Sequence, residues 1–342
     1  MFAATMLAMR AFLSHLLLPV ATAFAVFLLA NGMAKAAEPP VHECDRLTRH
    51  PEDRQGADVP GVAFETIDTD AAIAACTEAL EKYPDTPRFK YQLGRAIHAD
   101  GDAAAALPLY EEAAFDRHLI AVYIAYGEYS KAFNESGETD ESARLKTLEL
   151  MRFGAEALDD PWFQFELGRL LIGGVVVERD VDAGLRLIEA AANSEHPKAA
   201  AALGYIYQTG EFADQNYDEA FVWYRRAADL GEDIAIQTLD LLYGQVLTNS
   251  FYAFLLPGTA FDKTVAPINK YRRSDEEALR WIQDRAEDGD TESLELLALY
   301  SEEGFLVSKD RQKAIELYKR AIEAGSKTAK RQLEKMMSEE NE

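Results

Sequence analysis

The sequence predicts an all-α fold of stacked helix pairs, and three observations indicate it. A motif recurs about every 36 residues, so that Leu167-Gly168 precedes Leu203-Gly204 by that interval. Apolar residues within each copy follow the spacing of an amphipathic helix. Glycines stand where those helices should end. Repetition at such a period is typical of solenoids, in which each unit buries its apolar face against its neighbours.

The amino terminus has the features of an export signal at residues 1–36. Arg10 precedes a mostly apolar run at 16–30, and Ala34-Lys35-Ala36 follows the small-residue pattern of a cleavage site. An uncleaved membrane anchor is the alternative, because residues 11–30 are about long enough to cross a bilayer. We expect cleavage, a periplasmic or secreted protein, and no membrane span in the mature chain.

Residues 37–68 are expected to be an extended segment held by a disulfide between Cys44 and Cys76. These are the only cysteines, and an isolated pair in an exported protein usually forms a bridge. A metal site is the alternative, since potential ligands crowd the same stretch: His42, Glu43, Cys44, Asp45, His50 and Asp53. Their spacing matches no fixed zinc pattern, so no metal is expected.

Residues 69–338 are expected to form the helical repeats. The copy at 216–230 has an apolar stripe that includes Trp223 and Tyr224, acidic residues at its start, and Gly231 to end it. The same reasoning predicts helices at 69–82, 87–99, 103–115, 118–133, 139–157, 160–173, 181–193, 196–209, 216–230, 233–247, 274–288, 290–303, 310–324 and 326–338.

Small residues in the repeats predict close helix packing. Gly204 costs a helix about 1 kcal/mol relative to alanine, so a helical glycine there suggests that another helix approaches closely. Asp240 stands in the corresponding position 36 residues later. The helices around Asp240 are therefore expected to pack further apart.

The repeated pattern Ala-x-Leu-Gly-x-x-Tyr-x-x-Gly, followed by Asp-x-x-x-Ala-x-x-Trp-Tyr-x-x-Ala-Ala-x-x-Gly, resembles the Sel1-like repeat, a relative of the tetratricopeptide repeat. The match is closest at 196–231, good at 160–195 and 290–325, and weaker at 87–117. The resemblance implies a right-handed α-α superhelical solenoid that binds other proteins through a concave groove. It brings no catalytic residues and no cofactor.

The charge of the chain limits its partners. The formal net charge is −24, and removal of a signal whose only charges are Arg10 and Lys35 would make it −26. Nucleic acid and anionic lipid surfaces are polyanions, so neither is expected as a partner. Residues 339–342 add an acidic tail.

One interval between repeats is lengthened, which predicts an inserted loop at 244–273. A long connection in a compact repeat protein usually has a function or is disordered, and this one is too apolar for disorder. It either packs on neighbouring repeats or contacts a partner, because aromatic residues beside arginine are typical of interface hot spots. The candidate contact residues are Phe251, Tyr252, Phe254, Leu255, Phe261, Tyr271, Arg272 and Arg273.

The sequence carries no recognisable catalytic motif, such as a zinc-protease helix, a nucleophile elbow or a phosphate-binding loop. We therefore expect a non-catalytic scaffold for a protein or peptide partner. The alternatives are a hydrolase acting on cell-wall or peptide substrates, or a regulatory module of such an enzyme. A cleft where histidine, carboxylate and hydroxyl converge would favour the enzyme, and a groove lined by aromatic residues and scattered charges would favour binding.

Overall fold

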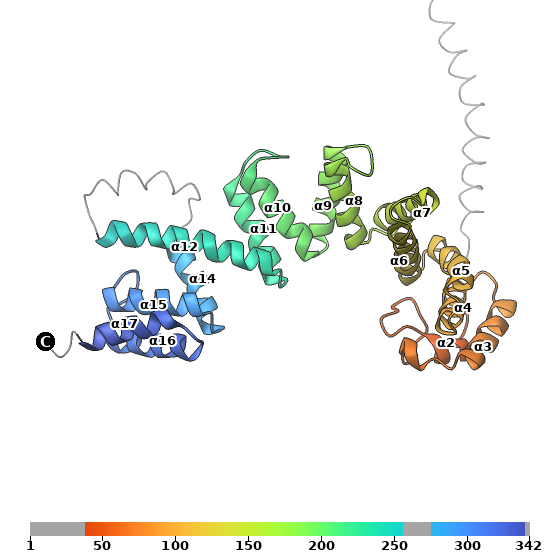
Figure 1. Cartoon of the computed structure of the whole chain (residues 1–342), viewed down its shortest axis with the longest axis horizontal. Helices are drawn as coiled ribbons and strands as arrows, with labels where there is room; N and C mark the ends of the chain where they lie inside the picture. Colours follow the sequence, from red (N-terminus) through yellow and green to blue (C-terminus); the bar gives the residue numbers. More distant parts are fainter. Residues whose placement is uncertain (1–37, 256–274, 339–342) are drawn as a thin grey trace, which may run out of the picture. The chain divides into compact units, whose positions relative to one another are not determined.

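The computed structural model describes residues 38–255 and 275–338, and all regular secondary structure in those ranges is helical (Figure 1). The chain divides into two compact units, with the boundary between Ala125 and Tyr126. The expected signal and acidic tail lie outside the described residues. None of the described helices is long and apolar enough to cross a membrane.

From residue 38 onward, the first unit contains four α-helices and the start of a fifth: α2 (Glu43–Thr48), α3 (Thr69–Lys82), α4 (Pro87–Ala99), α5 (Ala103–Phe115) and α6 (Leu119–Glu135). A short 3-10 helix at Phe64–Thr66 precedes α3. Helix α4 packs on α3 and α5, and α2 packs on α3 and α4. The expected extended segment is therefore partly helical. Its short helix α2 is possible because the His42 ring accepts from the Cys44 amide while Asp45 accepts from the His42 amide at 2.8 Å.

The second unit takes up the rest of α6 and continues through helices that pack as neighbours along the chain. After α7 (Glu141–Arg152) and a π-helical turn (Phe153–Ala157) come α8 (Pro161–Gly173), α9 (Val181–Asn193), α10 (Pro197–Thr209), α11 (Tyr217–Asp229), α12 (Asp233–Leu255), α14 (Asp275–Glu287), α15 (Thr291–Glu303), α16 (Arg311–Glu323) and α17 (Lys327–Ser338). The closest packing joins α8 to α9, α10 to α11 and α15 to α16. The predicted solenoid of stacked helix pairs is confirmed.

The pairs share one connection between their two helices. The first helix ends at a left-handed glycine, as at Gly210, and the returning chain donates from the Asn216 amide to the Tyr207 carbonyl at 2.9 Å. Asn216 then caps the second helix by accepting from the amides of its first turn. The same glycine and cap recur 36 residues earlier at Gly174 and Asp180, and this repeated geometry accounts for the period in the sequence.

Close packing holds the two helices of a pair together, as the sequence predicts. A Cβ added at Gly204 would lie 2.6 Å from the Tyr224 ring, a distance that real side chains do not tolerate. The Tyr224 hydroxyl donates to Gln208 Oε1 at 2.7 Å, which fixes the ring over the glycine. Tyr318 donates to Glu302 in the same way in a later pair.

Helix α12 is longer than expected, since it continues past residue 247 to Leu255. Phe251 is buried there, with its ring 5.4 Å from that of Tyr300 and 5.2 Å from that of Phe305. Further back in α12, Asp240 accepts from the Trp281 indole at 2.8 Å and from Arg285 at 3.2 Å. Where Gly204 allows a close approach of two helices, Asp240 instead joins α12 and α14 by hydrogen bonds.

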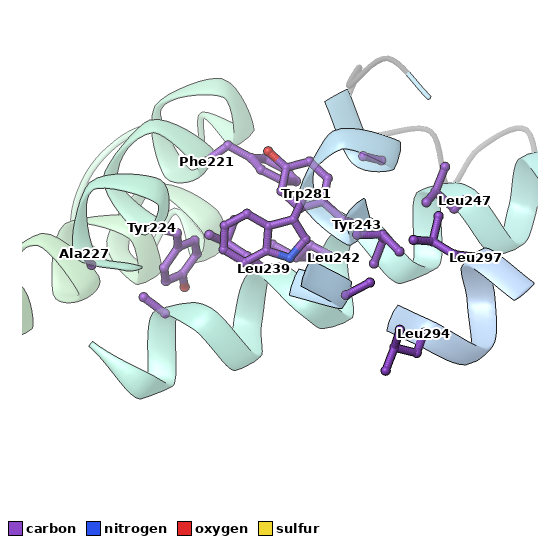
Figure 2. Close-up of a cluster of buried hydrophobic side chains, with 14 of the residues drawn as sticks. Phe221, Tyr224, Ala227, Leu239, Leu242, Tyr243, Leu247, Trp281, Leu294 and Leu297 are labelled. Atoms are coloured by element: carbon purple, nitrogen blue, oxygen red, sulfur yellow. The ribbon is translucent and has the colours of Figure 1, made fainter. Parts of the chain in front are cut away.

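A continuous apolar core runs through the later pairs. Figure 2 shows Trp281 of α14 among side chains of α11 and α12, with Tyr224 on one side and Leu242 and Tyr243 on the other. The Arg225 guanidinium lies 5.0 Å from the centre of the Trp281 ring. Each pair therefore contributes part of a core that only its neighbours complete.

Candidate functional site

The disulfide expected from the sequence is present. Cys44 and Cys76 are joined and fully buried. The residues that could have made a metal site have other partners: Asp45 accepts from Arg88, and Asp53 lies beside His118. In residues 38–255 and 275–338, no group of three or more potential ligands is placed to hold a metal ion.

The residues predicted to contact a partner at 244–273 are only partly described. Phe251 is 8% exposed and faces the core, so packing is its role. The backbone of Tyr252, Phe254 and Leu255 continues α12. Phe261, Tyr271, Arg272 and Arg273 lie outside the described residues, and their partner contacts stay a prediction.

A groove of about 720 Å³ lies where the first helices of three consecutive pairs, α8, α10 and α12, come together. Residues spaced three or four apart share one face of a helix, and this spacing brings single lines of side chains to the groove. The lining residues from these helices include Phe165, Arg169 and Ile172 of α8, Lys198, Ala202 and Tyr205 of α10, and Ile234 and Thr238 of α12.

The groove combines a buried apolar floor with exposed apolar side chains. Phe165 and Ile206 are buried in the floor, whereas Tyr205 is 52% and Ile234 66% exposed. Large side chains exposed together around a hollow are unusual on a monomeric surface and are typical of binding sites.

Three charged side chains border the groove: Arg169, Lys198 and Glu232. Arg169 also pairs with Glu166 at 3.0 Å on the same helix. Burial, and then the charge of Lys198, lower the pKa of neighbouring His196, which caps α10. The groove is thus locally more basic than a chain of net charge −24 would suggest.

A histidine, a carboxylate and a tyrosine ring do lie together elsewhere, in the first unit. His118 Nε2 lies 3.4 Å from Asp53 Oδ2, and the rings of Tyr91 and His118 stack at 4.5 Å. Burial works against ionisation of Asp53, but the adjacent His118 and the Gln55 amide, which donates to Asp53 at 2.9 Å, outweigh it and hold the Asp53 pKa below its usual value. All three residues are at most 2% exposed, so a substrate has no access to them. This cluster fastens residues 49–62 to the start of α6.

The groove residues were not singled out by the sequence reasoning, although a signal for them exists. Arg169 and Tyr205 each directly follow the glycine of a first helix, Gly168 and Gly204. Because the glycine faces the second helix of its pair, the next residue lies about a quarter-turn away, on the neighbouring face. Large residues at that position mark the groove.

Comparison with known proteins agrees with the fold of stacked helix pairs. The Sel1 repeat family model matches residues 163–196, 197–232 and 291–326, which correspond to the pairs α8–α9, α10–α11 and α15–α16. The first two of these pairs supply most of the groove. No curated protein matches the chain.

The solved structures that are similar to this chain include two bacterial repeat proteins. One is c5321, a protective antigen present in uropathogenic Escherichia coli strains that displays an SLR fold; it is 23% identical over 82% of this chain, with a TM-score of 0.43. This chain spans 61% of that protein's length. The other is a Sel1 repeat protein from Oxalobacter formigenes, which is 21% identical over 71% of this chain and 86% of its own, with a TM-score of 0.40.

Proposed function

Because three stretches of this chain match the Sel1 repeat model, we propose that the protein is a non-catalytic scaffold. It would bind a protein or peptide partner through the groove of α8, α10 and α12. The observation that carries the proposal is the exposure of Tyr205 and Ile234 over an apolar floor. An aromatic anchor site with charges at its border has the composition of an interface hot spot.

The groove extends over three consecutive repeats, which suits an elongated partner segment. Repeat proteins offer such extended surfaces because the same helix position recurs along the stack. A partner segment lying across the first helices would contact Ile172, Tyr205 and Ile234 in turn, one from each pair.

We also propose that the protein works in the periplasm or outside the cell. The buried Cys44–Cys76 disulfide supports this compartment, because such bridges persist where the surroundings are oxidising. The apolar run and cleavage pattern at residues 1–36 provide the route. The rival hydrolase finds no support in the groove, whose lining residues include no histidine.

The test is to compare partner capture by matched variants of residues 37–342. We expect Tyr205→Glu with Ile234→Glu to lose the partners that wild type captures from the periplasm of its own cells. The control Val222→Glu alters a residue of α11 that is 56% exposed but lies outside the groove, and it should capture them normally. Equal capture by all three folded proteins would contradict the proposal.

A further inference from the structure

The first repeat shows what lies on a first helix when its face is covered. Residues 38–62, called here the leading segment, lie on α4 of the same chain. Arg88 and Gln92 each donate to Asp45 Oδ1 at 3.1 Å. Arg95 donates to the carbonyls of Thr48 at 2.8 Å and Val62 at 2.7 Å. Arg88 also donates to the carbonyls of Pro39 and Pro40. An acidic side chain and four backbone carbonyls are thus held by cations of α4.

Helix α4 has the same register as the helices of the groove. Gly94 of α4 faces Tyr110 of the next helix, as Gly204 of α10 faces Tyr224. The residue four positions after each glycine then meets the tyrosine hydroxyl: His98 meets Tyr110 at 3.4 Å, and Gln208 meets Tyr224 at 2.7 Å. Residues at the same distance from Gly94 in α4 and from Gly204 in α10 therefore occupy equivalent positions.

Two cations that line the groove occupy the same positions, relative to the helix glycine, as the two arginines of α4 that hold the leading segment. Arg88 lies six residues before Gly94, and Lys198 lies six before Gly204. Arg95 directly follows Gly94, and Arg169 directly follows Gly168 of α8. Both Lys198 and Arg169 line the groove.

The cation at this position is not required by the repeat itself. In the matched repeat 291–326 the residue that corresponds to Lys198 is Glu292. The side chain of Lys198 is exposed and has no part in the packing of α10 against α11. The Lys198 ammonium is therefore accessible to a ligand at the groove.

We propose that the groove binds an acidic, partly apolar peptide segment of a partner protein in the way that α4 binds the leading segment. An aspartate or glutamate of the partner meets Lys198, backbone carbonyls meet Arg169, and apolar side chains cover Tyr205 and Ile234. This inference rests on the proposed function and adds the chemistry of the partner. The leading segment of a second copy is a poor occupant, because the disulfide and Arg95 hold it on its own α4.

The negative net charge of the whole chain does not prevent an acidic peptide from binding in the groove. At physiological salt, charges further away than about 8 Å are largely screened, so the cations at the groove decide the local interaction. A hydrogen bond between a charged pair is stronger than one between neutral groups. We expect the loss of the charged hydrogen bond to Lys198 to weaken peptide binding on the order of tenfold or more.

The experiment is selection of short random peptides, displayed on phage, against wild-type residues 37–342. The selected peptides should share an aspartate or glutamate next to apolar residues. Their affinity, measured by fluorescence anisotropy, should fall on the order of tenfold or more with Lys198→Glu and persist with Lys198→Arg. Lys319→Glu makes the same charge change on an exposed residue of α16 outside the groove and should have no effect.

Charge reversal provides the decisive arm. Replacing the shared acidic residue of a selected peptide by lysine should weaken binding to wild type and restore it to Lys198→Glu. Peptides that bind through Tyr205 yet share no acidic residue, or ignore Lys198→Glu, would overturn this inference and leave the proposed function standing. Failure to select any peptide sensitive to Tyr205→Glu would overturn both.

Discussion

Gly204 shows how a single missing side chain determines the distance between two helices. Its backbone does not have a positive φ, so conformational freedom is not the reason for glycine. The reason is space, because the Tyr224 ring occupies the place of a Cβ. The hydrogen bond from Tyr224 to Gln208 and the burial of the ring leave the tyrosine little room to move away.

Gly204→Ala is therefore predicted to destabilise the protein although alanine favours helices. Overpacking a buried contact costs about 1–3 kcal/mol, and the better helix propensity offsets up to about 1 kcal/mol of it. We expect a net loss of about 1–2 kcal/mol in the free energy of unfolding, measured in urea.

Gly127 provides the matched control, since it lies within α6 with nothing near its missing Cβ. Gly127→Ala should stabilise the protein by up to about 1 kcal/mol. A Gly204→Ala variant as stable as the Gly127→Ala variant would show that the Tyr224 ring does not hold its place.

At the scale of the element, the sequence was sufficient wherever local signals determine structure. The ends of α8, α10 and α15 agree with the predicted ranges to within about a residue, because glycines and caps mark them. The end of α12 was missed, since Phe251 extends that helix through contacts with Tyr300 and Phe305 that are distant in sequence. The groove was missed for the same reason, because it exists only when three helices stand side by side.

The contact between α12 and α14 also depends on a residue whose role the sequence did not reveal. Asp240 was expected to mark helices that pack further apart, and α12 and α14 do pack less closely than α10 and α11. The sequence did not reveal that the Asp240 carboxylate joins them by accepting from Trp281 and Arg285. Burial lowers the pKa of Arg285, but the hydrogen bond that Arg285 donates to Asp240, with the charge of that carboxylate, outweighs burial and raises the pKa. These hydrogen bonds join α12 to α14 at the position where other repeats have a glycine.

Asp240→Ala is predicted to cost about 1–3 kcal/mol in the free energy of unfolding, because the Trp281 indole N–H loses its acceptor. Trp281 is only 6% exposed, so water cannot readily replace the carboxylate. The unfolding can be followed in urea by tryptophan fluorescence. Asp240→Asn keeps an acceptor oxygen and should cost less; equal stability of wild type and the alanine variant would contradict the prediction.

At the scale of the whole molecule, stability in a repeat protein is a sum of local contributions. Each pair contacts mainly its neighbours in the second unit, from α8 with α9 to α16 with α17. A change in one repeat should therefore weaken that repeat and the next, and have little effect on distant ones. The disulfide lies within the first unit.

Reduction of Cys44–Cys76 is predicted to weaken the first unit selectively. A bridge that closes a loop of this size contributes about 3–4 kcal/mol in the chain-entropy model, and here it also holds the leading segment on α4. Hydrogen exchange under reductant should show faster exchange in residues 38–99 and little change in α15 and α16. The Cys44→Ser/Cys76→Ser variant should exchange in this way without reductant and not respond to it. An equal increase along residues 275–338 would mean that the protein unfolds as one cooperative body, and the additive description of its repeats would then be wrong.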